Sequence, residues 1–194
     1  MKQKIKNYSI HFIKEIIPIV AGILIALFID NWNAHRKDQA YINQVFSTVH
    51  SELKESREEI EFILPIQKDL VKALEKYADN EEKSLQQIVM ESKGIFIPQI
   101  KTTAWRSIAA TKIDLIDYDK VAAMTNIEDL KQMLSNKSAF LMNLLYSNMD
   151  KTDKSIKQTF KMVVLDIIQT ENTLEQRIEL MEKEGNKKGI TVMF

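Results

Sequence analysis

Apolar residues form one continuous block near the N-terminus, followed by several spaced stripes. Residues 16–29 read IIPIVAGILIALFI and carry no charged side chain. As a helix this block rises about 21 Å, whereas a hydrocarbon core is about 30 Å thick. Extending it back to Ile10 reaches about 30 Å and includes Lys14, whose long side chain can snorkel to the membrane surface. The block predicts an N-terminal transmembrane helix, with a signal sequence or a buried soluble helix as alternatives.

The flanks of the block favour an uncleaved membrane anchor. Trp32 follows directly, where interfacial aromatic residues are typical, and no A-x-A cleavage pattern comes after the apolar stretch. Basic residues are more frequent before the block than after it: Lys2, Lys4, Lys6 and Lys14 against Arg36 and Lys37. The positive-inside rule then predicts a single-pass protein with a cytoplasmic N-terminus.

One stripe of the predicted anchor carries residues suited to helix association: Glu15, Pro18, Gly22, Ala26 and Asn33. Gly22 and Ala26 form the small-xxx-small pattern that lets two membrane helices approach closely. Glu15 at the membrane boundary is expected to face a partner helix, headgroups or water rather than lipid. The alternative is a small pair that arises by chance and a Glu15 solvated among headgroups.

Beyond the anchor, apolar residues recur at steps of three and four, the spacing of coiled coils and helical bundles. The seam of the first stripe is Ile42, Phe46, Val49, Leu53, Ser56, Ile60, Ile63, Gln67, Leu70, Leu74 and Tyr77. Pro65 within it predicts a kink or short break near residues 63–64. Asp79 and Asn80 are expected to loosen the helix.

A second long stripe predicts a helix over residues 138–184. Its seam is Leu141, Leu145, Met149, Thr152, Ile156, Phe160, Val163, Ile167, Glu171, Leu174, Ile178 and Met181. Shorter helices are predicted between the two stripes. One spans the apolar residues from Leu85 to Val89 and ends near Gly94, and the next is capped by Thr102 or Thr103. The last is capped by Asp117 or Asp119 and ends at Ser135-Asn136.

These elements predict an all-α protein, with an N-terminal transmembrane helix followed by an elongated antiparallel helical bundle that has two long helices. Residues 1–33 would form the N-terminus and the anchor. Residues 34–184 would form the bundle, with an irregular insert near 94–117. Residues 185–194 would form a flexible tail.

Composition narrows the function classes. The 27 basic and 27 acidic residues cancel, so no electrostatic argument supports a nucleic-acid partner. Only 4 Gly and 3 Pro are present, too few for the frequent turns of an all-β fold. Cysteine is absent, which excludes disulfides and thiolate chemistry.

No catalytic or metal motif stands out. The histidines are His11, His35 and His50, none spaced to bring two imidazoles to one helical face, and no Glu-x-x-His occurs. Glycine-rich phosphate loops and a Gly-x-Ser-x-Gly elbow are also missing. We therefore expect no enzyme activity, cofactor or metal. A site built from Trp105, Arg106, Asp117 and Asp119 is the remaining enzyme alternative.

The irregular insert is the segment of the bundle in which partner binding is expected, because loops on a rigid scaffold often bind. The candidate residues are Phe96, Trp105, Arg106, Tyr118 and Asp119. The alternative is that Trp105 and Phe96 close the hydrophobic core as ordinary packing.

The stretch FIKEIIPIVAGILIALFIDNWN resembles the N-terminal signature of the DUF6090-type family, bacterial membrane proteins common in Bacteroidetes. The matching positions are Glu15, Gly22, Ile25-Ala26-Leu27 and Trp32-Asn33. A weaker similarity lies in SIAATKIDLIDYDKVAAM, where Ala110-Thr111 stands in place of a more usual glycine. The resemblance implies a single-pass helical protein of the bacterial inner membrane and lends no activity.

Two functions are expected from these observations. The first is a membrane-anchored interaction or scaffold protein without catalysis, whose bundle lies in the periplasm and whose partners are the lipid bilayer and either a second copy or another protein. The alternative is an oligomeric membrane effector or channel-associated subunit whose bundle senses a ligand or partner.

Overall fold

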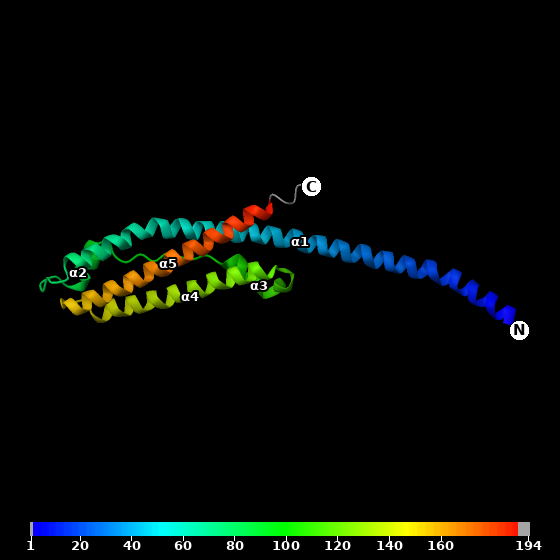
Figure 1. Ribbon diagram of the computed structural model, residues 1–194. Helices are drawn as coiled ribbons and strands as arrows, with labels where there is room; N and C mark the ends of the chain where they lie inside the picture. The colour runs from blue at the N-terminus through cyan, green and yellow to red at the C-terminus, as the bar shows by residue number, and fades with distance from the viewer. Residues whose placement is uncertain (1, 190–194) are drawn as a thin grey trace. The chain divides into compact units, whose positions relative to one another are not determined.

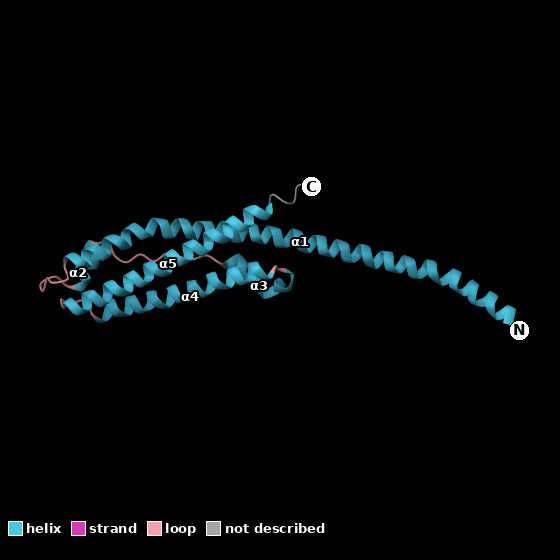
Figure 2. Ribbon diagram, in the orientation of Figure 1, coloured by secondary structure: helices cyan, strands magenta, loops and turns pink. Residues whose placement is uncertain are grey.

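The computed structural model describes the backbone of residues 2–189 and the side chains of residue 12 and residues 14–183. Every regular element in that part of the chain is helical, which confirms the all-α class (Figures 1 and 2). The elements are α1 (Lys2–Lys76), α2 (Leu85–Glu91), α3 (Thr103–Lys112), the 3₁₀ turn η1 (Ile113–Leu115), α4 (Tyr118–Ser147) and α5 (Lys154–Gly189). The chain divides into two compact units, Met1–Gln44 and Val45–Phe194.

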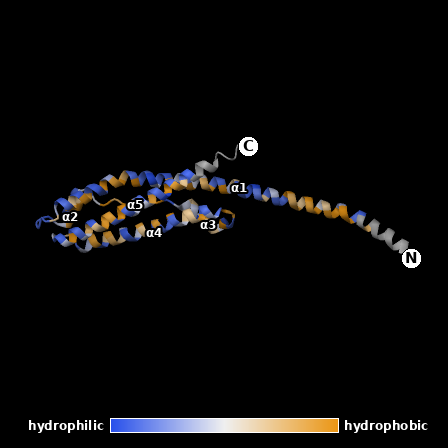
Figure 3. Ribbon diagram, in the orientation of Figure 1, coloured by the Kyte–Doolittle hydropathy of each residue, from blue (hydrophilic) through white to orange (hydrophobic). Residues whose placement is uncertain are grey.

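The first unit is the N-terminal part of α1. Among the described helices, α1 alone is long and apolar enough to cross a membrane, with a mean hydropathy of 1.8 in its apolar window. Orange turns mark this window in Figure 3, and none of it is buried. In the core helix of a soluble protein, other elements would bury such a window. The observed exposure therefore leaves a membrane span or a signal sequence.

The second unit is built on the C-terminal part of α1 together with α4 and α5. Arg57 lies 3.5 Å from Glu182, and Glu75 lies 3.1 Å from Lys161, so α5 runs antiparallel to α1. α4 and α5 form a helical hairpin and lie side by side (Figure 1). Because α5 is antiparallel to both, α1 and α4 run in the same direction. The predicted bundle of two long helices is thus a bundle of three long helical segments.

A parallel pair of helices requires a long connection, and residues 77–117 provide it by returning along the bundle. Part of this connection is extended, and its backbone bonds to polar side chains of α1. The backbone N–H of Lys101 donates to Ser56 Oγ at 2.8 Å, and that of Ala104 donates to Glu52 Oε2 at 3.0 Å. The side chains of α1 therefore hold the returning segment in place.

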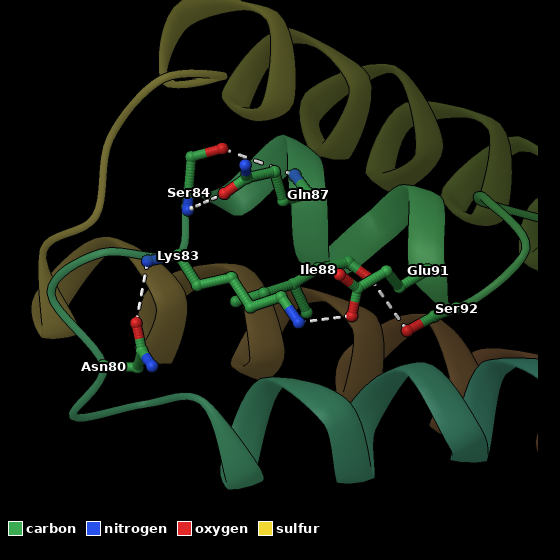
Figure 4. Close-up of polar contacts among 7 residues, drawn as sticks. All are labelled: Asn80, Lys83, Ser84, Gln87, Ile88, Glu91 and Ser92. Atoms are coloured by element: carbon green, nitrogen blue, oxygen red, sulfur yellow. Dashed lines mark hydrogen bonds and ion pairs between the residues drawn. The ribbon is translucent and has the colours of Figure 1, made fainter.

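The helix α2 begins with a capping box (Figure 4). The Ser84 backbone N–H donates to Gln87 Oε1 at 2.9 Å, and the Gln87 backbone N–H donates to Ser84 Oγ at 3.4 Å. Before the cap, Asn80 Oδ1 accepts a bond from the Lys83 backbone N–H at 2.7 Å, and the Lys83 ammonium pairs with Glu91. The capping box stabilises the N-terminus of a helix of only 7 residues, and the pair of Lys83 with Glu91 links that end to the last residue of the helix.

The first turn of α2 also docks on the turn between α4 and α5. The backbone N–H of Leu85 donates to the Lys151 carbonyl at 2.9 Å, and that of Gln86 donates to the Met149 carbonyl at 3.0 Å. Backbone donors that have no partner within a helix are thereby bonded to another element.

α2 ends in a Schellman motif, close to where the sequence predicts. The Gly94 N–H donates to the Val89 carbonyl at 2.9 Å, and the Lys93 N–H donates to Met90 at 3.2 Å. Lys93 has φ 71° and Gly94 has φ 95°, both in the left-handed region. Glycine adopts this conformation without steric cost, whereas Lys93 does not.

The core of the second unit follows the predicted seams. Their apolar members are mostly buried, and the least exposed are Val49, Leu53, Ile60, Leu74, Leu141, Phe160, Ile167, Leu174 and Ile178. Truncating such a side chain to alanine typically costs about 2–5 kcal/mol.

The turn between α4 and α5 lies at residues 148–153, so the predicted helix end at Ser135-Asn136 is wrong. Ser135 and Asn136 are exposed within α4, where each costs only about 0.5 kcal/mol relative to alanine. Asn148 builds the actual turn: its Nδ2 donates to the Leu144 carbonyl at 2.8 Å, and its own carbonyl accepts from Lys151 N–H at 3.0 Å. The apolar spacing continues across this turn, which explains the error.

Of the predicted kink or short break near Pro65, the break is wrong, because α1 is helical without interruption to Lys76. Proline removes one hydrogen bond, but Ile63 and Leu70 on either side are buried and hold the helix against the bundle. At the other end, α5 continues past the predicted end at Glu184 to Gly189. The rest of the predicted tail, residues 190–194, lies outside the described residues.

Two predicted caps occupy the right positions without the expected bonds. Thr102 and Asp117 are the N-cap residues of α3 and α4, and neither makes a side-chain capping hydrogen bond. Thr102 is buried, and its Oγ1 accepts instead from Lys131 Nζ at 2.7 Å, so tertiary contact replaces the local cap.

The continuity of α4 can be tested at Asn136. Asn136→Pro should lower the free energy of unfolding by about 3 kcal/mol or more, because proline removes a helical hydrogen bond and clashes with the preceding turn. Asn136→Ala at the same exposed position should cause no loss. Urea unfolding of the full chain in a neutral detergent measures both. Equal stability of the two variants would place a turn at this position after all.

Candidate functional site

The anchor stripe keeps its geometry in the structure. α1 is helical throughout, so Glu15, Pro18, Gly22, Ala26 and Asn33 share one face as their spacing predicts. The first four are exposed and Asn33 is partly exposed. A Cβ added at Gly22 would meet nothing within 4 Å. Packing within the chain therefore does not require glycine at this position.

The end of the apolar block carries an aromatic and a basic residue in contact. The Arg36 guanidinium lies over the Trp32 ring, 5.5 Å from its centroid. The tryptophan side chain is 58% exposed. An amphipathic ring beside a cation is the pair expected where a helix leaves the hydrocarbon region.

The candidates of the irregular insert are not brought together. Phe96 lies at the level of Gln67, to which its carbonyl is bonded, whereas Trp105 contacts Phe46. These two points on α1 are about 30 Å apart along the helix. The five predicted residues therefore do not form one binding surface.

Trp105 occupies the alternative role that the sequence left open. It is 4% exposed, and its ring meets that of Phe46 edge to face with centroids 6.5 Å apart. Arg106, Tyr118 and Asp119 are exposed, with Tyr118 82% exposed. The tryptophan is part of the core, while its polar neighbours lie at the surface.

Sequence reasoning did not single out a polar cluster inside the bundle. Gln67 of α1 is 4% exposed and Glu171 of α5 is fully buried. Gln67 Nε2 donates to Glu171 Oε1 at 2.8 Å and to the Phe96 carbonyl at 2.9 Å. The cluster thus joins α1, α5 and the returning segment at one point.

Burial raises the pKa of the Glu171 carboxyl to about 7, against the smaller lowering effect of its bond from Gln67. A cavity of about 10 Å³ adjoins the cluster, bordered by Gln67, Phe96, Leu70 and Leu141. This volume is at the lower limit for one water molecule. The cavity can therefore hold one water molecule at most and has no room for an organic substrate.

A second buried polar group closes one end of the bundle. Lys157 of α5 is fully buried, and its ammonium donates to the carbonyls of Tyr77 at 3.1 Å and of Asn80. Burial lowers its pKa, and the nearby Asp153 acts in the opposite direction. Lys157 bonds carbonyls that follow the last turn of α1, in the manner of a C-terminal cap.

Part of this chemistry had a signal in the sequence. Ser56, Gln67 and Glu171 stand at seam positions, where the helical period otherwise places apolar residues. A polar residue on such a position indicates a buried partner. Lys157 had no such signal, because its neighbour Ile156 fitted the seam instead.

Among the side chains that the structure describes, no three His, Asp or Glu residues lie close enough together to hold a metal ion. Comparisons with protein-family models, with curated proteins and with solved structures found no match.

The role of Trp105 can be measured directly. Trp105→Ala should lower the free energy of unfolding by about 3–5 kcal/mol, because it leaves a cavity beside Phe46. Tyr118→Ala, at an exposed position of the same region, should change it by less than about 0.5 kcal/mol. Urea unfolding in neutral detergent provides the comparison, and a small loss for Trp105→Ala would contradict a core role.

Proposed function

We propose that the chain is a membrane-anchored helical interaction or scaffold protein without catalytic activity. The observation that carries the proposal is the exposed apolar window of α1. Its large side chains are 45–72% exposed from Ile19 to Ile29, and nothing in the described chain covers them. A lipid bilayer is the environment that removes such a surface from water on all sides.

The energetics favour insertion of this window. Leucine, isoleucine, valine and phenylalanine each contribute about −0.3 to −0.6 kcal/mol at the centre of a membrane helix. Residues 16–29 of the window have no Asp, Glu, Lys or Arg to oppose them. The helical backbone already satisfies its own hydrogen bonds, as a span in lipid requires.

The proposed location is the bacterial inner membrane, with a cytoplasmic N-terminus and a periplasmic bundle. Basic residues in excess before the window support this orientation. The resemblance of residues 12–33 to the DUF6090-type family supports a single-pass protein. The contact between Trp32 and Arg36 supports a membrane boundary at the C-terminal end of the window.

The proposed partners are the bilayer and a second copy of the chain or another protein. The open space around Gly22 supports a close approach by another helix. Glycine destabilises a helix by about 1 kcal/mol relative to alanine, and no contact within the chain requires glycine at this position. The same observation favours the alternative function, an oligomeric membrane effector or channel-associated subunit.

Membrane anchoring predicts a specific effect of charge in the window. Ile19→Asp combined with Ile23→Asp should move the protein from the membrane to the soluble fraction, since each acidic residue near a helix centre costs about 3 kcal/mol. Phe62→Asp combined with Met162→Asp is the matched control, because these side chains of the second unit are just as exposed. Carbonate extraction of cell membranes measures the partition. A protein that resists extraction in both forms would contradict anchoring by this window.

The orientation is tested with a reporter at Phe194 that is active in only one compartment. The wild-type protein should show periplasmic activity. Replacing Lys2, Lys4 and Lys6 by Gln leaves more basic residues after the window than before it, so the reporter should move toward the cytoplasm. A cytoplasmic reporter on the wild-type protein would reverse the proposed orientation and favour the effector function.

A further inference from the structure

The polar cluster of Gln67 and Glu171 has unequal numbers of donors and acceptors. Both hydrogens of the Gln67 amide are used, one on Glu171 Oε1 and one on the Phe96 carbonyl. The Phe96 carbonyl can only accept, so it fixes which end of the amide is nitrogen. The two remaining oxygens, Gln67 Oε1 and Glu171 Oε2, are buried, and neither has a hydrogen-bond partner.

An ionised carboxylate cannot satisfy these two atoms, because it accepts hydrogen bonds and donates none. A protonated carboxyl has one O–H donor. We propose that Glu171 holds a proton in the folded bundle and that its Oε2–H donates to Gln67 Oε1. The amide and the acid then form a reciprocal pair, each donating to the other, and no polar atom of the pair is left without a partner.

The charges around the pair do not oppose this assignment. From α4, the Lys137 ammonium is bonded to Asp166 at 2.8 Å and to Thr170 Oγ1 at 2.9 Å, beside Glu171 on α5. From α1, Lys68 is exposed. The returning segment has no ionisable side chain from residue 94 to residue 100.

Farther along the same elements, the charged side chains are paired with other residues or partly exposed to solvent. Lys101, the next residue of the returning segment, pairs with Glu55 at 2.6 Å, and Glu175 on α5 is partly exposed. No Coulombic effect contributes to the pKa of Glu171, which burial and the bond from Gln67 determine. The carboxyl therefore keeps its proton because burial disfavours its charged form, and no cation favours its ionisation.

The proton makes the bundle sensitive to pH near neutrality. The pKa of Glu171 is about 7 in the folded chain and 4.5 in an exposed glutamate. Between these values the folded form binds more protons than the unfolded form. The stability that the pair contributes is therefore complete below about pH 4.5 and is lost as the pH rises through about 7.

Loss of the proton from Glu171 would affect the returning segment. Deprotonation leaves a buried carboxylate that must recruit water or move, and the cavity bordered by Gln67 and Phe96 is the nearest space. Gln67 also holds the Phe96 carbonyl, so a change in the pair reaches residues 95–97 directly. This inference rests on the second unit alone and does not depend on the proposed membrane function.

The test compares the full-length chain with Glu171→Gln in neutral detergent micelles. The amide of this variant carries a permanent N–H donor in place of the acid proton, so it should form the same reciprocal pair at every pH. Urea unfolding is followed by Trp105 fluorescence, with Trp32→Phe in all proteins so that one fluorophore reports. Glu175→Gln, one turn along α5 and partly exposed, is the matched control.

The ratio of the wild-type unfolding constant to that of Glu171→Gln should rise on the order of 100-fold between pH 4.5 and pH 8. The ratio for Glu175→Gln should stay flat across the titration of Glu171. Parallel profiles of the wild-type protein and Glu171→Gln would overturn the proposal.

A second measurement needs only the wild-type fold. The ¹³C carboxyl resonance of Glu171, assigned by its loss in Glu171→Gln, should remain at the protonated position until about pH 7. If Glu171→Gln does not fold, the spectra of the wild-type protein alone still decide, through the presence of one glutamate carboxyl that titrates above pH 6. Midpoints near 4.5 for all glutamates would show an ionised Glu171 and reject the pair.

Discussion

The second unit depends on how the backbone between α1 and α4 is satisfied. This segment crosses the length of the bundle, and where it is extended it lacks the internal hydrogen bonds of a helix. A buried backbone group without a partner costs about as much as a lost hydrogen bond. Ser56 and Gln67 of α1 supply partners to the extended part, and Glu52 accepts a bond from the first turn of α3. Polar residues on the buried side of α1 therefore make the parallel arrangement of α1 and α4 possible.

Tertiary contacts explain which helices and helix ends the sequence could predict and which it could not. Apolar periodicity was sufficient to predict helices, the buried seams and the end of α2 near Gly94. It failed at Asn148, because the spacing of apolar residues continues in phase across the turn. The break that Pro65 could cause is absent, because burial of the flanking residues outweighs the cost of one missing hydrogen bond. Local signals are reliable only where tertiary contacts do not compete with them.

Among the candidate sites, too, those that depend on spacing within one helix follow from the sequence, and those that depend on tertiary placement do not. The anchor stripe depends only on spacing within one helix, so its geometry follows from the sequence. The insert depended on tertiary placement, and the structure separates Phe96 from Trp105 and buries the latter. The pairing of Gln67 with Glu171 joins residues 104 positions apart, which no local pattern predicts. Their common feature in the sequence was a polar residue on an apolar seam.

The short helix α2 has a consequence for how the unit opens. A helix of 7 residues is far below the length that persists alone in water, so α2 exists only through its contacts. Its first turn is bonded to the carbonyls of the α4–α5 turn, and its last turn leads directly into the returning segment. We expect these three parts to exchange with solvent as one cooperative element, since release of the turn removes the support of α2 and frees the segment that follows.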